Sequence, residues 1–109
     1  MSIQLTDNAQ GIGIRIQQEM TIYTAAEQQQ VLYEQLRKGK NIQIDLSGVT
    51  EIDSAGLQLL LWLKRESGRQ SLQLRLTEHS EAVVEVFEML DLSKFFGDPI
   101  VLAKQRTSS

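Results

Sequence analysis

The sequence has no cysteine, one proline and one histidine in 109 residues. Without cysteine, the chain has neither a disulfide framework nor a thiolate metal site. Aromatic residues make up only 6% of the chain and the formal net charge is −3. Nucleic-acid-binding surfaces are usually basic, and single strands stack on aromatic rings, so the composition argues against a nucleic-acid partner.

Long apolar runs are also missing. The longest, residues 57–63, is interrupted by Gln58 and is far too short to cross a bilayer. The first residues, MSIQLTDN, lack the basic and apolar regions of a signal peptide. We therefore expect a cytoplasmic protein without membrane insertion, with one domain over residues 1–102 and a polar tail, residues 103–109, that is disordered.

Apolar and polar residues alternate in several short segments, as they do in half-buried strands. The expected strands are Ile3–Leu5, Ile12–Ile16, Ile42–Leu46, Leu72–Leu76 and Ile100–Leu102. Helical apolar spacing between them predicts three helices, which begin near Thr24, Ser54 and Ser80. This order predicts a single α/β domain with a mixed β-sheet and three main helices packed mostly on one face.

Local details refine these expectations. Thr24 and Glu27 have the spacing of a capping box. The glutamine run 28–30 is expected to be mostly solvated surface. Leu90 is expected to face inward from the third helix, and the single histidine, His79, is expected at the surface just before that helix.

The central stretch of the chain, residues 41–63, reads as a strand, a loop and a helix. Asp53 stands at the expected N-cap, and Ser54 is the first helical residue. The Ser54 hydroxyl is therefore expected at the positive end of a helix dipole, near unpaired backbone N–H groups. This position favours a serine that carries a phosphate.

A helical projection divides this helix into two faces. Gly56, Leu59, Leu60 and Leu63 are expected to face the sheet. The opposite face, which continues from Ser54, carries Gln58, Leu61, Trp62 and Arg65. A leucine and a tryptophan on an outward face indicate a protein-binding surface. The alternative, equally weighted, is that Trp62 packs against a neighbouring helix.

The sequence gives little support to an enzyme. No base is expected beside Ser54, since Asp53 is used as a cap. Asp45, Glu51 and Asp53 are interpreted as a cap and loop carboxylates, because no imidazole or fixed ligand spacing accompanies them. We expect no catalytic residue, no metal and no cofactor.

The stretch DLSGVTEIDSAGLQLLL resembles the STAS domain of anti-sigma factor antagonists. The Asp-Ser-(Ala/Ser)-Gly turn of that family stands here as Asp53, Ser54, Ala55 and Gly56. The expected order of elements is also similar to the family, so the resemblance covers nearly the whole chain.

The resemblance implies a regulatory role without catalysis. In such proteins the serine at the position of Ser54 is phosphorylated by an anti-sigma factor that is a serine kinase, and a PP2C-type phosphatase removes the phosphate. The unphosphorylated form binds the anti-sigma factor and releases the sigma factor. Asp53, Ala55 and Gly56 would shape the turn. The helical projection, and not the resemblance, predicts that Gln58, Leu61, Trp62 and Arg65 contact the partner.

The chain also departs from the family. Many members have Gly-Glu-Leu-Asp before the first helix, where this chain has Gln18, Glu19, Met20 and Thr21. The segment 21–25, TIYTA, looks like STAS proteins that accompany chemotaxis systems. A signalling pathway of that kind, or a subunit that docks on a lipid-transport ABC ATPase, is therefore the alternative function.

Overall fold

The computed structural model describes residues 2–92. Its elements are β1 (Ile3–Asn8), β2 (Gly11–Ile16), α1 (Ala25–Leu36), β3 (Ile42–Asp45), α2 (Ser54–Arg69), β4 (Leu74–Thr77) and α3 (Glu81–Leu90). The expected last strand, Ile100–Leu102, and the polar tail lie outside the described residues.

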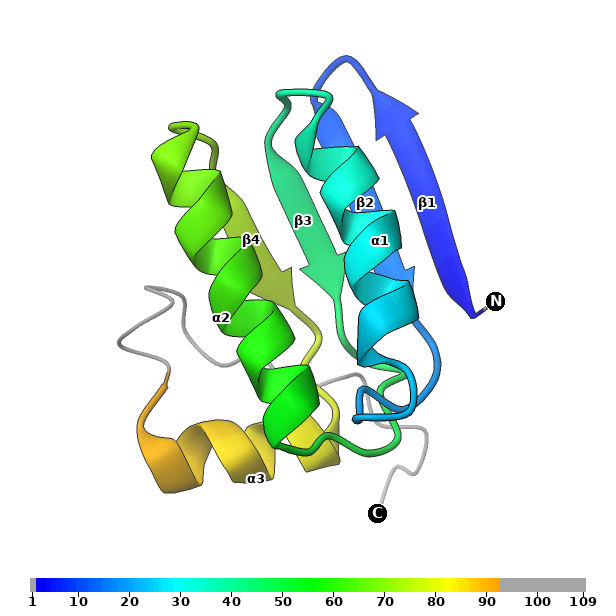
Figure 1. Ribbon diagram of the computed structural model, residues 1–109, viewed down its shortest axis with the longest axis vertical. Coiled ribbons are helices and arrows are strands. Elements are labelled where there is room, and N and C mark those ends of the chain that lie inside the picture. Colours follow the sequence, from blue (N-terminus) through cyan, green and yellow to red (C-terminus); the bar gives the residue numbers. More distant parts are fainter. Residues whose placement is uncertain (1, 93–109) are drawn as a thin grey trace.

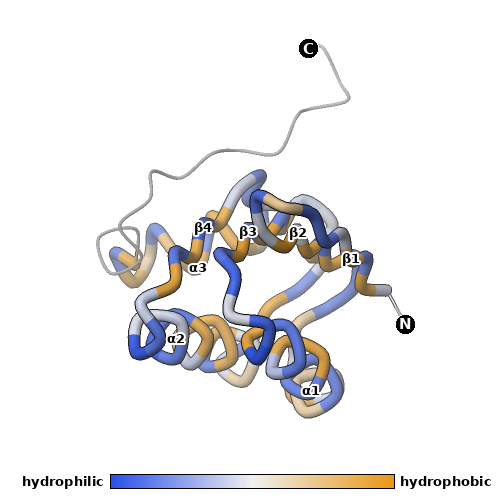
Figure 2. Tube along the Cα trace, turned by 90° about the horizontal axis from the view of Figure 1, so that it is seen from above, coloured by the Kyte–Doolittle hydropathy of each residue, from blue (hydrophilic) through white to orange (hydrophobic). Residues whose placement is uncertain are grey.

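The sheet contains β1, β2, β3 and β4 in that spatial order. β1 and β2 are antiparallel, whereas β2, β3 and β4 are parallel to one another. Helices α1 and α2 lie side by side on one face of the sheet, and α3 crosses its end below β4 (Figures 1 and 2). The prediction of one α/β domain with a mixed sheet and three helices is confirmed.

The core lies between the sheet and the helices. One face of β2, β3 and β4 is apolar and buried, whereas Arg15, Gln43 and Arg75 on the other face are exposed. This alternation fits a sheet with one wet face. The central core residues are Ile12, Ile14, Ile16, Ile42, Ile44, Leu74 and Leu76 from the strands, and Leu32, Leu36, Leu60, Leu63, Val83 and Phe87 from the helices.

The parallel strands end, and both α1 and α2 begin, at the same end of the domain (Figure 1). In the tube view the apolar segments of α1 and α2 face the sheet (Figure 2). Helix N-termini carry positive partial charge, so this end of the molecule gathers two such termini. The Asp53–Gly56 turn lies at this end.

One expectation about α1 is wrong, and another holds only in part, since Gln29 and Gln30 are exposed as expected and Gln28 is not. Thr24 precedes the helix but makes no side-chain cap; its hydroxyl instead donates to the Glu19 carbonyl at 2.9 Å. Gln28 is buried and donates through Nε2 to the same carbonyl at 2.9 Å. The chain before α1 therefore folds back onto the first turn, and this contact explains why Gln28 is not solvated.

The end of α3 also differs from the expectation. Leu90 is 53% exposed, because Asp91 adopts a left-handed conformation and Leu92 donates its N–H to the Phe87 carbonyl at 2.9 Å. This closure is typical of helix C-termini. Leu92, which follows the helix, is partly buried and packs against the core.

His79 is buried, contrary to the expected surface position. It is 2% exposed, and its ring meets that of Phe87 edge-on with centroids 5.5 Å apart. An edge-to-face contact of this kind is favourable between aromatic rings. The histidine therefore belongs to the packing of α3 on the sheet.

Candidate functional site

The start of α2 is held by the Asp53 carboxylate. Its Oδ1 accepts hydrogen bonds from the N–H groups of Ala55 at 2.9 Å and Gly56 at 3.1 Å. Its Oδ2 accepts a third, at 3.0 Å, from the N–H of Ile22 in the loop before α1. The predicted N-cap is confirmed, and the same carboxylate also joins the two helix starts.

These contacts favour the ionised form of Asp53. The hydrogen bond from the Ile22 N–H contributes most to lowering the pKa of this carboxyl below its ordinary value, and the Gly56 and Ala55 N–H groups add to the effect. Each of these donors stabilises the ionised form more than the protonated form. Asp53 is therefore a permanent negative charge beside Ser54 at neutral pH.

Gly56 is required by close packing. A Cβ atom at this position would lie 1.9 Å from the Met20 carbonyl oxygen. Met20 forms an isolated parallel bridge with Ile52, donates its N–H to the Glu51 carbonyl at 2.8 Å and accepts from the Asp53 N–H at 3.2 Å. Only glycine lets the first turn of α2 pack directly on the Met20 backbone. Close packing therefore explains why the last residue of the Asp-Ser-Ala-Gly motif, Gly56, is a glycine.

Ser54 begins α2 and is exposed. Within residues 2–92 its hydroxyl makes no hydrogen bond. The expectation of unpaired N–H groups nearby holds only in part, because Asp53 already occupies those of Ala55 and Gly56, whereas the Ser54 N–H makes no hydrogen bond within residues 2–92. A phosphate on Ser54 would stand beside a carboxylate, and the helix dipole would favour it.

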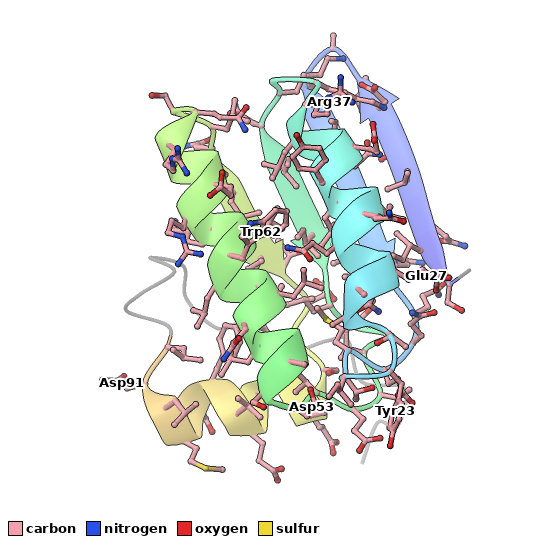
Figure 3. All side chains as sticks on the ribbon, viewed as in Figure 1. Tyr23, Glu27, Arg37, Asp53, Trp62 and Asp91 are labelled. Atoms are coloured by element: carbon pink, nitrogen blue, oxygen red, sulfur yellow. The ribbon has the colours of Figure 1, made fainter. Side chains whose placement is uncertain are left out.

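Two exposed apolar residues next to this turn were not identified from the sequence. Ile22 is 70% exposed and Tyr23 is 89% exposed. The Thr21 hydroxyl donates to the Glu19 carboxylate and accepts from the Tyr23 N–H, and the Thr24 N–H bonds to the Thr21 carbonyl. This network folds the loop into a tight turn that places Tyr23 at the same end of the molecule as Asp53 (Figure 3). The available signal was a pair of adjacent apolar residues, Ile22 and Tyr23, in the segment that connects the expected second strand to the first helix.

A groove of about 720 Å³ runs between α1 and α2 from this turn. It brings together the residues expected to contact a partner, and Ile22 lies at its start. Its lining residues are Ile22, Ala25, Ala26, Gln29, Ala55, Gln58, Leu59, Leu61, Trp62 and Arg65. The two helices thus form a shallow groove with a mixed polar and apolar lining.

The outward face of α2 is less uniform than expected. Gln58 and Arg65 are exposed, whereas Leu61 and Trp62 are half-buried and pack against the core. Trp62 lies between α2 and α1 (Figure 3) and also lines a second hollow with Tyr33. Trp62 therefore packs toward the neighbouring helix, as the alternative interpretation expected, and still contributes surface to the groove. Its contact with a partner stays a prediction.

The acidic residues near the turn do not form a cluster. Asp45 pairs with Arg15 at 3.2 Å and accepts from the Ser47 N–H at 2.8 Å, whereas Asp53 caps α2. In the part of the chain that the structure describes, no group of three or more such side chains is placed to hold a metal. No helix among residues 2–92 is long and apolar enough to cross a membrane.

Comparisons with known proteins agree with this geometry. The family model described as STAS domain matches residues 2–106. The solved structure of tm1081 from Thermotoga maritima has a TM-score of 0.79 at 20% identity, covering 91% of this chain and 85% of that chain. No curated protein sequence matches significantly.

Structures of anti-sigma factor antagonists are also similar. The Mycobacterium paratuberculosis protein has a TM-score of 0.76 at 19% identity, covering 91% of this chain and 83% of that one. The Bacillus cell fate determinant SpoIIAA in its phosphorylated form has a TM-score of 0.69 at 18% identity, covering 95% and 92%. These likenesses concern the fold, and the family match over residues 2–106 shows that the chain belongs to the STAS domain family.

Proposed function

We propose that this STAS domain is a non-catalytic, cytoplasmic regulator whose binding to a protein partner is switched by phosphorylation of Ser54. The observation that carries the proposal is the exposed Ser54 hydroxyl, which lies between the Asp53 cap and the groove that Gln58 and Arg65 line. The partner is an anti-sigma factor with serine kinase activity, and a PP2C-type phosphatase reverses the modification. SpoIIAA, which has a similar fold, has been solved in both phosphorylated and unphosphorylated forms.

The switch acts through local charge. A phosphate adds about −1.5 to −2 charges at neutral pH. Asp53 is already ionised and its oxygens are occupied by Ile22, Ala55 and Gly56, so the phosphate adds to an existing negative charge, and these three N–H groups are not free to bind it. A partner surface that fits a neutral hydroxyl would then lose shape and charge complementarity.

The partner surface consists of the turn and the groove. Ile22 and Tyr23 offer exposed apolar area at its start, Leu61 and Trp62 form its apolar wall, and Arg65 carries the positive charge. Arg65 makes no ion pair within residues 2–92. Aromatic residues and arginines dominate the energetics of many interfaces.

The test uses the full chain and a partner captured from native lysate with the unmodified protein as bait. Calorimetry then compares unmodified protein, protein phosphorylated on Ser54 and the Ser54→Ala variant. We expect tight binding by the unmodified protein and Ser54→Ala, and at least tenfold weaker binding by the phosphorylated form. Ser54→Asp should weaken binding less, because a carboxylate has less charge and bulk than a phosphate.

Equal affinity for the phosphorylated and unmodified forms would overturn the switch. The protein would then be a constitutive docking subunit, as in the transport complexes considered above. A matched control is phosphomimetic Ser80→Asp, since Ser80 caps α3 and its oxygen already accepts from the Val83 N–H at 3.3 Å. That variant should not affect the affinity for the partner.

A further inference from the structure

We propose that a second copy of this chain pairs with the outer edge of β1, so that two sheets join into one across a two-fold axis. β1 is the terminal strand of the sheet, next to β2 alone (Figure 1). Its outer edge presents backbone groups that no other strand among the described residues occupies. Such an edge is a template for another strand.

The register with β2 identifies the free groups. Ile12 donates its N–H to Asn41 on the β3 side, and Gln17 donates to Ser2 on the β1 side. Because backbone direction alternates along a strand, Gly11, Gly13 and Arg15 also face β1, where they oppose Asn8, Thr6 and Gln4. The backbone groups of the remaining β1 residues, Ile3, Leu5 and Asp7, therefore point outward.

This outward set is symmetric about Leu5. In an antiparallel pair with a second copy, Leu5 opposes the same residue of the other copy, and Ile3 opposes Asp7. Each opposed pair can exchange both of its backbone hydrogen bonds, so the register uses every outward group of the strand. A two-fold axis requires such self-complementarity.

The side chains suit the same pairing. Leu5 opposes the buried Ile14 on the helix-covered face of the sheet, yet 44% of it remains exposed at the edge. In the pair, Leu5 would contact its own counterpart across the axis. On the open face, Gln4 would oppose Thr6. Neither this pair nor the Leu5 pair brings like charges together.

Of the usual protections against pairing, this edge has only one charged residue, Asp7. Natural edge strands are often interrupted by lysine, proline or a bulge. β1, with the sequence IQLTDN, has no lysine or proline, and its ladder with β2 runs without interruption from Ile3 to Asn8. Its single charge, Asp7, is balanced by Lys40 at 2.7 Å and Lys38 at 3.4 Å.

The first experiment is sedimentation equilibrium of the full chain up to millimolar concentration. We expect the average mass to rise from that of the 12.3 kDa monomer toward that of a dimer. Leu5→Lys should raise the dimer dissociation constant at least about tenfold, because it opposes two like charges at the axis. Gln70→Lys, the same charge change at an exposed position after α2, should dimerise as the wild type does.

The second experiment needs no substitution and identifies the surface. Amide hydrogen exchange is measured by NMR at low and high protein concentration. We expect the amides of Ile3, Leu5 and Asp7 to become protected as concentration rises, whereas those of Gln4 and Thr6, which face β2, should be protected at both concentrations.

A wild type that stays monomeric throughout would overturn the proposal. So would a dimer that persists unchanged in Leu5→Lys, since its contact would then lie elsewhere. Protection of the outer amides only in the presence of the captured partner would assign the edge to that partner instead. None of these outcomes affects the Ser54 switch, which is measured with phosphorylated and unmodified protein.

Discussion

Asp53 Oδ2 lies 3.0 Å from the backbone nitrogen of Ile22, a residue 31 positions earlier in the chain. The other oxygen of the same carboxylate caps α2. One side chain thus fixes the exposed loop of Ile22 and Tyr23 relative to Ser54. If one partner contacts both the loop and the serine, as we propose, Asp53 fixes the distance between these two contact points.

The stability of the domain should depend on pH through the ionisation of Asp53. Its pKa is lower in the folded protein than its ordinary value of 3.8, chiefly because of the Ile22 N–H. Its contribution is therefore complete above that ordinary value and is lost as pH falls through the lower, folded value. We expect wild type to have a higher Tm than Asp53→Asn at pH 7, and the difference to shrink below about pH 4.

Thermal unfolding followed by circular dichroism between pH 2 and 7 would measure this difference, within the ordinary range of carboxyl titration. Glu51→Gln is the matched control, because the exposed Glu51 side chain makes no hydrogen bond to residues 2–92. A Tm difference for Asp53→Asn that is the same at every pH would show that its ionisation contributes nothing.

The two glycines of α2 should respond in opposite directions to alanine. At Gly56 the new methyl group would collide with the Met20 backbone, so we expect a loss of about 3 kcal/mol or more. At Gly68 nothing lies within 4 Å of the new atom. Alanine there should stabilise the helix by about 0.5–1 kcal/mol. Chemical denaturation of both variants is the measurement, and equal effects would contradict the close approach of Met20.

The two serines at helix starts should also differ. Ser80 caps α3 by accepting from the Val83 N–H, whereas Asp53, not Ser54, caps α2. Ser80→Ala should therefore lower the free energy of unfolding by about 1 kcal/mol, and Ser54→Ala should leave it within about 0.5 kcal/mol of wild type. Urea denaturation would compare them, and a large loss for Ser54→Ala would assign a structural role to its hydroxyl.

The charge of Arg65 should matter to the partner. Arg65→Glu should weaken binding of the captured partner at least tenfold with little change in Tm, because the side chain is exposed and has no ion pair among the described residues. Arg75→Glu is the matched control, since Arg75 is exposed on the opposite face of the sheet. Similar losses in both variants would indicate a general charge effect and not a surface along α2.

Leu61→Asp is a less specific probe than its outward place on the helix suggests. Leu61 lines the groove, but it also packs against the core. We therefore expect the substitution to lower both Tm and partner affinity. Tyr23→Ala separates the two effects, because this side chain is 89% exposed: affinity should fall while Tm stays unchanged. Calorimetry and thermal unfolding of the two variants are the measurements.

Much of the fold follows from local pattern in the sequence. Alternation placed β2 and β3 to within a residue, and the polar residues before α2 and α3 indicated their first turns. The strand β4 begins at Leu74 and not at Leu72, because Ser71 takes a left-handed turn and the Leu72 N–H bonds to Ser67. The alternation of apolar and polar residues does not reveal a turn of this kind at the end of a helix.

The candidate site was only partly accessible from the sequence. Asp53 could be identified as a cap, since its neighbours in sequence are its partners. Its bond to Ile22 could not, because that contact depends on how two distant loops meet. For the same reason the sequence does not distinguish the buried Gln28 from its exposed neighbours Gln29 and Gln30: Gln28 bonds to the Glu19 carbonyl, which the fold brings to the first turn of α1.

The contact between Gly56 and Met20 has a consequence for any enzyme that modifies Ser54. A residue in a flexible segment can be drawn into a kinase cleft as an extended peptide. Ser54 cannot be extended in this way, because the turn that contains it is held at two points. Asp53 accepts hydrogen bonds from three N–H groups, and Gly56 packs directly against the Met20 backbone. Such an enzyme must accept a helix end as its substrate, so it would have to recognise the tertiary structure, and a short peptide containing the serine would be a poor substitute for the domain.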